Sequence, residues 1–354
     1  MNDYVYPWRL IPNKRHQYPG GREIDRFRGV FPAQDDNHPE AWIGSTISSV
    51  HPSFPMDGFS ECLRPSGGMC YLVDAIRENP QDMIGPTDRL SLLVKLLDAK
   101  EQLAFQCHPS REVARRLFGS DFGKAEAWVV IGLREDVLEP PYMLLGFKEG
   151  ISRDLFESLY QSRDFKEIDK LAHKIPVSVG DVFFVGPGVP HAIGPGCFVV
   201  EIQEPSDLTV GCWIPANMNE QQRILHEARV MESFDFTGYS FAENLLRCRC
   251  NPQMIRRGSW GTEELLIGPS QTTYFSCSRL QATRPVAWRK TGRAVICIVM
   301  EGDGSLIHGD TITSLKKSDE LFMSANVHET LIQPGENGIT LMLAHPEGAS
   351  HGMI

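Results

Sequence analysis

Two histidines and one glutamate are the side chains of this chain best suited to holding a metal ion. His108 follows Gln106 at a spacing of two residues, and side chains at that spacing point to the same face of a β-strand. Glu126 begins a run of β-prone residues, and His191 follows a turn rich in glycine and proline. Two imidazoles and a carboxylate that leave one position open form a catalytic zinc shell, with Gln106 as a candidate fourth ligand.

The identity of the metal and the grouping of these residues stay open at this level. Imidazole nitrogen and carboxylate oxygen suit Zn²⁺, but Fe²⁺, Mn²⁺ and Co²⁺ accept the same donors. The chain has eleven histidines, and a single histidine is more often a surface or hydrogen-bonded core residue than a ligand. Whether the three residues come together therefore has to be judged from the sequence segments around them.

Short β-prone runs separated by glycine and proline turns are expected to position these side chains. Residues 1–60 read as irregular structure with short strands, residues 102–148 as mostly strand, and residues 90–97 as either a helix or a buried strand. Helices are expected over 71–79, 152–173 and 219–232. Further strands are expected over 127–133, 177–185, 197–203, 274–280, 294–300, 320–323 and 340–344, with a linker near 235–265.

Composition excludes several classes of protein. The 354 residues carry a formal net charge of -10 and include 42% hydrophobic residues, enough for a sizeable core. A nucleic-acid binder would need a basic surface, and no long run of Lys or Arg supplies one. Nine cysteines without framework spacing indicate a reducing compartment, and no apolar stretch approaches the length of a membrane helix. A cytoplasmic protein is expected, without nucleic-acid or membrane partners.

Several segments resemble known motifs. Residues 180–192 are similar to the second motif of the cupin superfamily, with Gly186 where a proline is usual. The segments 40–45, 92–109, 123–128 and 201–207 follow the order of motifs in the class I mannose-6-phosphate isomerase (phosphomannose isomerase) family. Four motifs in the same order are far more specific than one, so the chain is identified as a member of that family from about residue 40 to its end.

The resemblance implies a mainly β fold of two cupin-type jelly-roll domains with a few helical inserts. Residues 1–240 would form the metal-binding, catalytic-type domain, and residues 260–354 a second, degenerate cupin without a metal. The implied reaction is a zinc-dependent aldose–ketose isomerisation of mannose 6-phosphate and fructose 6-phosphate through an enediol, in a monomer or homodimer with one Zn²⁺ per chain.

The resemblance also implies roles for single residues. His108, Glu126, His191 and, in part of the family, Gln106 match metal ligands. Residues that match other active-site positions are the catalytic candidates Lys124, Glu201 and Asp207 and the substrate-phosphate candidate Lys95. Other readings of the two lysines are a solvated turn for Lys124 and a pair with Asp98 for Lys95. An acid at position 201 lies in an apolar strand, where burial without a partner is costly.

Two positions depart from the family pattern. Gly211 stands where the family carries an arginine four residues after the aspartate, and Ala104 stands where many members have a serine. Losing one group that stabilises charge costs on the order of 2–4 kcal/mol. Arg223 and Arg229 are candidates for supplying the charge instead.

These departures leave two alternatives to the isomerase. One is a non-catalytic or altered-substrate sugar cupin that keeps the metal. The other is a different cupin enzyme such as a metal-dependent oxygenase, which the segments 40–45 and 123–128 fit poorly.

Overall fold

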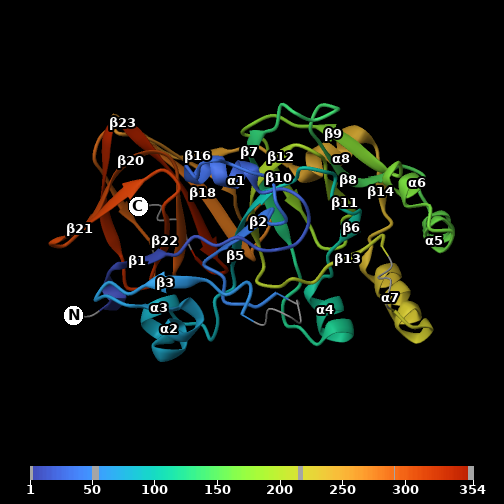
Figure 1. Cartoon of the computed structure of the whole chain (residues 1–354), viewed down its shortest axis with the longest axis horizontal. Helices are drawn as coiled ribbons and strands as arrows, with labels where there is room; N and C mark the ends of the chain where they lie inside the picture. The colour runs from blue at the N-terminus through green and yellow to red at the C-terminus, as the bar shows by residue number, and fades with distance from the viewer. Residues whose placement is uncertain (1–2, 50–55, 214–217, 291, 350–354) are drawn as a thin grey trace.

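The computed structural model describes residues 3–49, 56–213, 218–290 and 292–349, and these residues form three largely antiparallel sheets. Figure 1 shows two β bodies side by side, one built from the middle of the chain and one mainly from its C-terminal part. The expectation of a mainly β chain of the two-cupin type is confirmed.

Two six-stranded sheets make up the body that contains the candidate metal ligands. The first runs in the order β15 (Arg249–Cys250), β10 (Val182–Val185), β7 (Glu126–Leu133), β12 (Cys197–Gln203), β5 (Leu93–Asp98) and β2 (Glu40–Ile43). The second runs in the order β13 (Val210–Gly211), β6 (Gln106–Cys107), β11 (His191–Ile193), β8 (Tyr142–Lys148) and β14 (Gly238–Tyr239), with β9 (Ala172–Pro176) paired to β8. Buried side chains from both sheets, such as Trp128 and Ile193, share one hydrophobic core.

The third sheet has eleven strands and combines both ends of the chain. Its path is β16 (Gln253–Gly258), β17 (Gly261–Ile267), β18 (Phe275–Ala282), β23 (Glu329–Pro346), β20 (Val295–His308), β22 (Glu320–Met323), β1 (Pro7–Leu10), β3 (Glu61–Leu63) and β4 (Met69–Tyr71). The strands β19 (Val286–Arg289) and β21 (Thr311–Lys316) pair with β23 and β20. Trp8 lies opposite Phe322, so a strand near residue 8 joins the C-terminal strands of this sheet to β3 and β4. The division into units at 1–240 and 260–354 stays a prediction.

Helices lie around the sheets and several begin with a side-chain cap. They are the short 3-10 helix η1 (Asp3–Val5) and α1 (Arg22–Arg28), α2 (Leu72–Glu78), α3 (Pro80–Ile84), α4 (Arg111–Phe118), α5 (Arg153–Gln161), α6 (Phe165–Asp169), α7 (Glu220–Ser233) and α8 (Phe241–Cys248). Asn219 caps α7 with a reciprocal bond from Gln222, which satisfies two backbone N–H groups that the helix start leaves free. Figure 1 shows α4 and α7 below the second sheet of the metal-ligand body.

Most of the expected elements are present, and the leucine-rich segment is resolved as a strand. All six residues of β5 are buried because neighbouring strands and both faces of the sheet cover them, so they show no alternation in the sequence. The helices expected near 71–79, 152–173 and 219–232 correspond to α2, to α5 with α6, and to α7. The segment 172–176 is already strand β9, so the second expected helix ends earlier than predicted.

Three expectations were wrong. The segment 102–148 contains α4, whose apolar residues Ala114, Leu117 and Phe118 recur at helical spacing and whose start is capped by Ser110, a signal that the reading as mostly strand passed over. The irregular N-terminal segment contains the seven-residue helix α1. The expected linker at 235–265 instead contains α8 and several paired strands, because its polar residues face solvent while Asn244 and Cys248 are buried.

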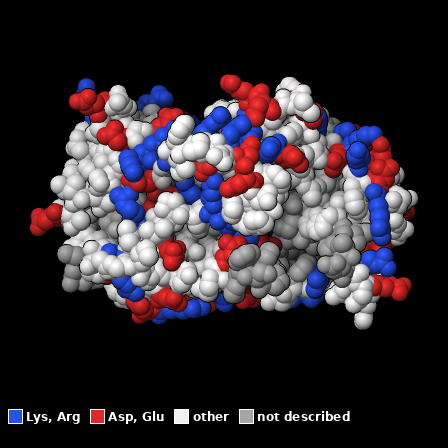
Figure 2. Space-filling model, in the orientation of Figure 1, with Lys and Arg blue, Asp and Glu red and all other residues white. Residues whose placement is uncertain are grey.

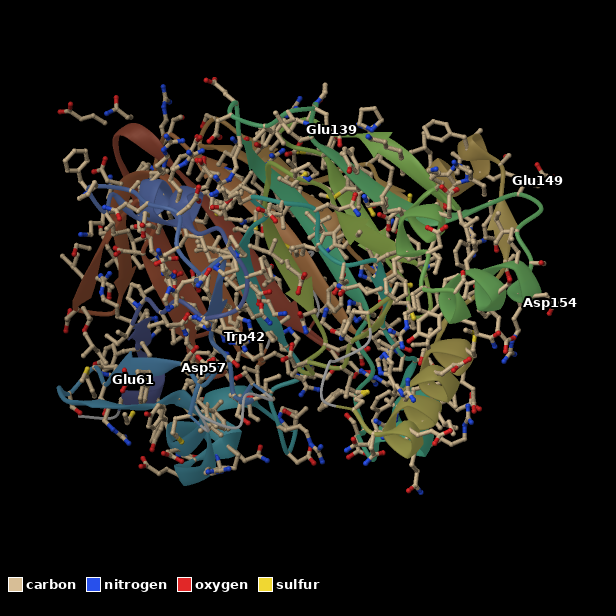
Figure 3. All side chains as sticks on the ribbon, turned by 45° about the vertical axis from the view of Figure 1, so that its right-hand side comes forward. Trp42, Asp57, Glu61, Glu139, Glu149 and Asp154 are labelled. Atoms are coloured by element: carbon tan, nitrogen blue, oxygen red, sulfur yellow. The ribbon has the colours of Figure 1, made fainter. Side chains whose placement is uncertain are left out.

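The face of the molecule seen in Figure 2 carries both charges without a large region of one sign. Figure 2 shows Lys and Arg interspersed with Asp and Glu over the visible face. Figure 3 shows Glu139, Glu149 and Asp154 projecting outward from loops and a helix end, whereas Trp42 lies inside the fold near Asp57. In the described part of the chain, no helix combines the length and apolar character needed to cross a membrane.

Candidate metal centre

The three predicted metal ligands converge on one buried point. Nε2 of His108 lies 3.1 Å from Oε2 of Glu126, and Nε2 of His191 lies 3.4 Å from its Oε1. The three ligand atoms lie within 4.8 Å of one another, and each side chain is at most 1% exposed. The group could therefore hold a metal ion, as the sequence predicted. Among the described residues it is the one such group.

Backbone carbonyls set the orientation of both imidazoles. Nδ1 of His108 lies 2.9 Å from the carbonyl oxygen of Leu208, and Nδ1 of His191 lies 2.9 Å from that of Val189. A carbonyl oxygen can only accept, so each Nδ1 carries the proton and donates it. Each Nε2 is then left with a free lone pair facing Glu126, which is the arrangement that a metal-binding histidine needs.

The electrostatics of the group keep the ligands in their metal-binding protonation states. Burial, with the nearby charge of Lys124, lowers the pKa of His108 to about 4, and burial also lowers the pKa of His191. Burial by itself would raise the pKa of Glu126, but Lys124 and His108 outweigh it and hold that pKa well below its usual range. Two neutral imidazoles and one carboxylate are thus favoured at neutral pH.

Lys124 lies directly against the metal-ligand group. Its Nζ is 2.8 Å from Nε2 of His108, donates a hydrogen bond to Glu126, and is 3.9 Å from Oε1 of Glu201. The alternative of a solvated lysine in a turn is wrong, because Lys124 is 4% exposed. Lys124 lies two residues before Glu126, the first residue of β7, so the two side chains point to the same face.

A buried ion pair of Lys95 and Glu201 lies beside the contact between Lys124 and Glu126. Glu201 on β12 is the cross-strand partner of Lys95 on β5, and Lys95 Nζ is 3.1 Å from Glu201 Oε1 and 3.9 Å from Oε2 of Glu40. Burial lowers the pKa of Lys95, but Glu201 and Glu40 outweigh this and raise it above its usual value. The expected alternative pair of Lys95 with Asp98 is not formed, because Asp98 binds Arg134 instead.

These groups border a cavity of about 610 Å³. Six of the eight predicted site residues line it, namely Lys95, Gln106, Lys124, Glu126, Glu201 and Asp207. The other two, His108 and His191, lie just behind this wall in contact with Glu126 and Gln106. Gln106 Nε2 is 3.4 Å from Nε2 of His191, so its amide adjoins the metal-ligand group. Its place as a fourth ligand stays a prediction.

Comparison with known proteins finds relatives that share the name mannose-6-phosphate isomerase. No family model matches the chain. A Bacillus subtilis protein named probable mannose-6-phosphate isomerase GmuF is 26% identical over 347 residues, covering 97% of this chain and all of that protein. Mannose-6-phosphate isomerase of Streptococcus mutans is 29% identical over 234 residues, covering 66% of this chain and 67% of its own.

A solved structure shares the fold over nearly the whole length. The crystal structure of mannose 6-phosphate isomerase from Bacillus subtilis superposes with a TM-score of 0.75 at 23% identity, covering 96% of this chain and 99% of that one. Over nearly its whole length the chain is therefore similar to proteins named mannose-6-phosphate isomerase. The ordered motifs of the sequence contain residues that surround one cavity.

Sequence reasoning missed part of this site. Glu40 belongs to a recognised motif but was assigned no role, although it lines the cavity and accepts a hydrogen bond of 3.0 Å from Tyr18. Arg15 is 3% exposed, stacks on Trp42 at 3.9 Å and lies 4.0 Å from Asp207. Burial of a charged residue near a motif is visible only in three dimensions, so no signal in the sequence marks Arg15.

The two arginines proposed to replace the missing family arginine do not reach the cavity wall. Arg229 donates to the carbonyl of Leu117 at 3.1 Å and lies over the ring of Phe118. Arg223 lines a different, smaller hollow between α5 and α7. Neither is among the described residues that border the metal-ligand group, so the expectation that one of them supplies charge there was wrong.

Proposed function

We propose that the protein is a zinc-dependent aldose–ketose isomerase that interconverts mannose 6-phosphate and fructose 6-phosphate through an enediol. The observation that carries the proposal is the meeting of His108, Glu126 and His191 at the wall of a cavity that also contains acid–base groups. The names of the relatives, mannose-6-phosphate isomerases of Bacillus subtilis and Streptococcus mutans, support the substrate pair.

The ligand set fits a divalent ion. Two neutral imidazoles and a carboxylate, all oriented by hydrogen bonds or ion pairs, match the donor set of catalytic zinc sites. A bound divalent ion would supply Lewis-acid polarisation of the sugar oxygens at C1 and C2. Lys124 Nζ now contacts two of the three ligand groups, so its ammonium has to turn toward the cavity when they bind a cation.

Glu201 and Lys124 are the proposed acid–base pair. Isomerisation removes a proton from C2 of the aldose and returns a proton to C1, while a hydroxyl proton moves between the two oxygens. Glu201 is a buried carboxylate at the cavity wall that can take and return the carbon-bound proton. Lys124, 3.9 Å from it, can donate to the developing oxyanion. Lys95 fixes the Glu201 carboxylate from the strand beside it.

Asp207 is proposed to bind a sugar hydroxyl. It lines the cavity, its side chain is 20% exposed, and its Oδ2 lies 4.0 Å from the buried guanidinium of Arg15. A carboxylate oriented from behind and open in front is suited to accept hydrogen bonds from hydroxyl groups. The role of Lys95 near a substrate phosphate stays a prediction, because its ammonium is already paired with two carboxylates.

The test is conversion of mannose 6-phosphate to fructose 6-phosphate by the zinc-loaded protein. We expect turnover in the parent protein, a loss of about 10³-fold or more in kcat for Glu201→Gln, and retention of metal in that variant. His328→Ala is the matched control, because His328 is exposed and lies just before β23 of the eleven-stranded sheet. Absence of turnover in a protein that has bound zinc would contradict the proposed reaction.

The structure also favours one second candidate. Gly211 adjoins the metal-ligand group where a charged side chain is expected from the family pattern, so a metal-binding sugar cupin with an altered substrate is the alternative. The same assay on other aldoses separates the two.

A cytoplasmic location and a monomer or homodimer stay predictions. The nine cysteines are all free thiols, as suits a reducing compartment.

A further inference from the structure

One wall of the cavity is built from a single segment of the chain. Asp207, Leu208, Thr209 and Trp213 line the cavity, and Gly211 lies between Thr209 and Trp213 in this segment. Gly211 is paired across the sheet with Gln106, which is paired in turn with His191. Cross-strand partners present their side chains to the same face, so position 211 faces the cavity next to the metal-ligand group.

The indole ring of Trp213 takes the space of the missing side chain. A Cβ atom added to Gly211 would lie 1.8 Å from Cζ3 and 2.4 Å from Cε3 of Trp213. Contacts that short are impossible, so the ring lies directly on the Gly211 backbone and requires glycine there. Trp213 therefore covers the wall beside Gln106, where the family pattern would place a guanidinium.

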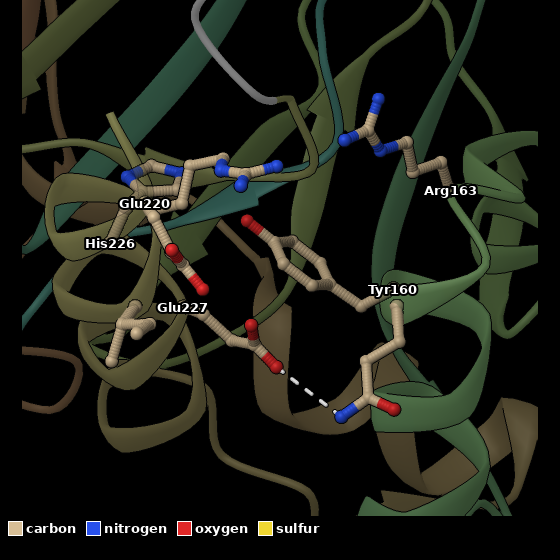
Figure 4. A pocket seen from close by; sticks show the side chains of 8 residues that line it. Tyr160, Arg163, Glu220, His226 and Glu227 are labelled. Atoms are coloured by element: carbon tan, nitrogen blue, oxygen red, sulfur yellow. Dashed lines mark hydrogen bonds between the residues drawn. The ribbon is translucent and has the colours of Figure 1, made fainter. Parts of the chain in front are cut away.

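The backbone of Trp213 is tied to α7. Nε2 of His226 donates to the backbone carbonyl of Trp213 at 3.1 Å, and the two rings lie 6.2 Å apart. Figure 4 shows His226 beside Glu220 and Glu227 at a hollow of about 250 Å³, with Tyr160 of α5 pointing across toward α7. Held in this way, Trp213 presents an aromatic surface to the cavity instead of a mobile charged chain.

The cationic side chains that the structure describes in the cavity lining are already paired with carboxylates. Among the described residues that line the cavity, the cationic ones are Lys95 and Lys124, and each is paired with a carboxylate. The acidic ones are Glu40, Glu101, Glu126, Glu201 and Asp207. Two ammonium groups and five carboxylates give a formal charge of -3, which one divalent cation would reduce to -1. A dianionic phosphate gains little from such a wall.

We infer that Trp213 is a substrate-binding residue that stacks on the carbon chain of the sugar, and that this cavity therefore binds neutral and phosphorylated aldoses with similar affinity. The C–H face of a sugar is apolar and fits a flat indole, while its hydroxyls remain free for Asp207 and Gln106. The inference rests on the proposed function in placing C1 and C2 of the sugar at the metal-ligand group. The substrate class thus includes the unphosphorylated hexose.

The test is calorimetric binding of mannose and mannose 6-phosphate to the zinc-loaded protein and to Trp213→Ala and Trp213→Phe variants. We expect the two dissociation constants of the parent protein to agree within about tenfold, and Trp213→Ala to weaken both by about tenfold or more. Trp213→Phe keeps an aromatic face and should retain most of the affinity. Trp260→Ala, a tryptophan outside the cavity lining, is the matched control and should change neither constant.

The outcomes separate this inference from the proposed reaction. Mannose 6-phosphate binding more than 100-fold tighter than mannose, or binding of both sugars unchanged in Trp213→Ala, would overturn the inference whether or not turnover occurs. Binding as expected without any isomerisation would sink the proposed reaction alone. If Trp213→Ala fails to fold by circular dichroism, the folded Trp213→Leu variant takes its place and should show the same weakening.

Discussion

Lys95 and Glu201 are cross-strand partners on β5 and β12, with the ammonium nitrogen 3.1 Å from a carboxylate oxygen and both residues 3% exposed. The pair stands between the metal-ligand group and Glu40, so three carboxylates and two lysines alternate along one wall of the cavity. Each charge is buried only because its neighbours carry the opposite sign. Removing one charge therefore leaves others uncompensated in a medium that solvates them poorly.

Lys95→Met should destabilise the protein by about 3–5 kcal/mol, because it leaves Glu201 and Glu40 buried without their partner. Urea unfolding at pH 7 measures this change. The double variant Lys95→Met, Glu201→Gln should recover much of the loss, since it removes both charges. Lys170→Met, which breaks a surface pair with Glu167, is the control and should leave the unfolding midpoint unchanged. A single variant as stable as the parent would contradict the pairing.

His108→Ala should abolish stoichiometric metal binding, because it removes one of three protein ligands and leaves an incomplete shell. We expect elemental analysis to fall from about one zinc per chain to near zero, with kcat reduced in parallel. His328→Ala, an exposed histidine, should keep the metal content of the parent. Full zinc occupancy in His108→Ala would show that the ion is held elsewhere.

The stability of the metal-free protein should fall as the pH is lowered from about 6.5 to about 4. Burial and the charge of Lys124 lower the pKa of His108 to about 4, whereas a histidine in the unfolded chain titrates near 6.5. Within this range the unfolded chain binds a proton that the folded chain does not, so acid favours unfolding. The pKa of His191 is lowered in the same sense and adds to the slope.

Urea unfolding in the presence of a chelator at pH 7, 5.5 and 4.5 measures this slope. His108→Gln removes one titrating group, and the dependence on pH should become shallower in that variant. Stability that rises as the pH falls through this window would mean that His108 gains rather than loses a proton in the folded protein.

Gly211→Arg should not create a working arginine in this fold. The new side chain would start inside the ring of Trp213, so it must displace the indole at a cost of about 1–3 kcal/mol. We expect a lower melting temperature and weaker sugar binding than in the parent. Adding Trp213→Gly should relieve the clash and recover stability. A single Gly211→Arg variant with parental stability and higher turnover would show that Trp213 moves aside freely.

Part of this fold was readable from local patterns. The β-prone residues of β7 and β12 predicted their strands closely, because β-branched and aromatic side chains suit a pleated buried surface. Helix α4 was missed although Ala114, Leu117 and Phe118 recur at helical spacing, because the β-prone runs around it dominate the pattern of that segment. The pairing of Trp8 with Phe322 could not be predicted either, because the residues of a four-residue strand do not specify which distant strand it will pair with.

The sequence by itself determined the ligand types, their order along the chain and the strands that hold them. This was possible because metal-binding chemistry admits few residue types and strand periodicity sets which side chains share a face. Only the tertiary structure decided that Glu40 and Trp213 line the same cavity with Arg15 close to Asp207, and that Arg223 and Arg229 do not line it. Those outcomes depend on packing between segments far apart in the chain, where the space that one ring occupies excludes another side chain, and no local pattern records that exclusion.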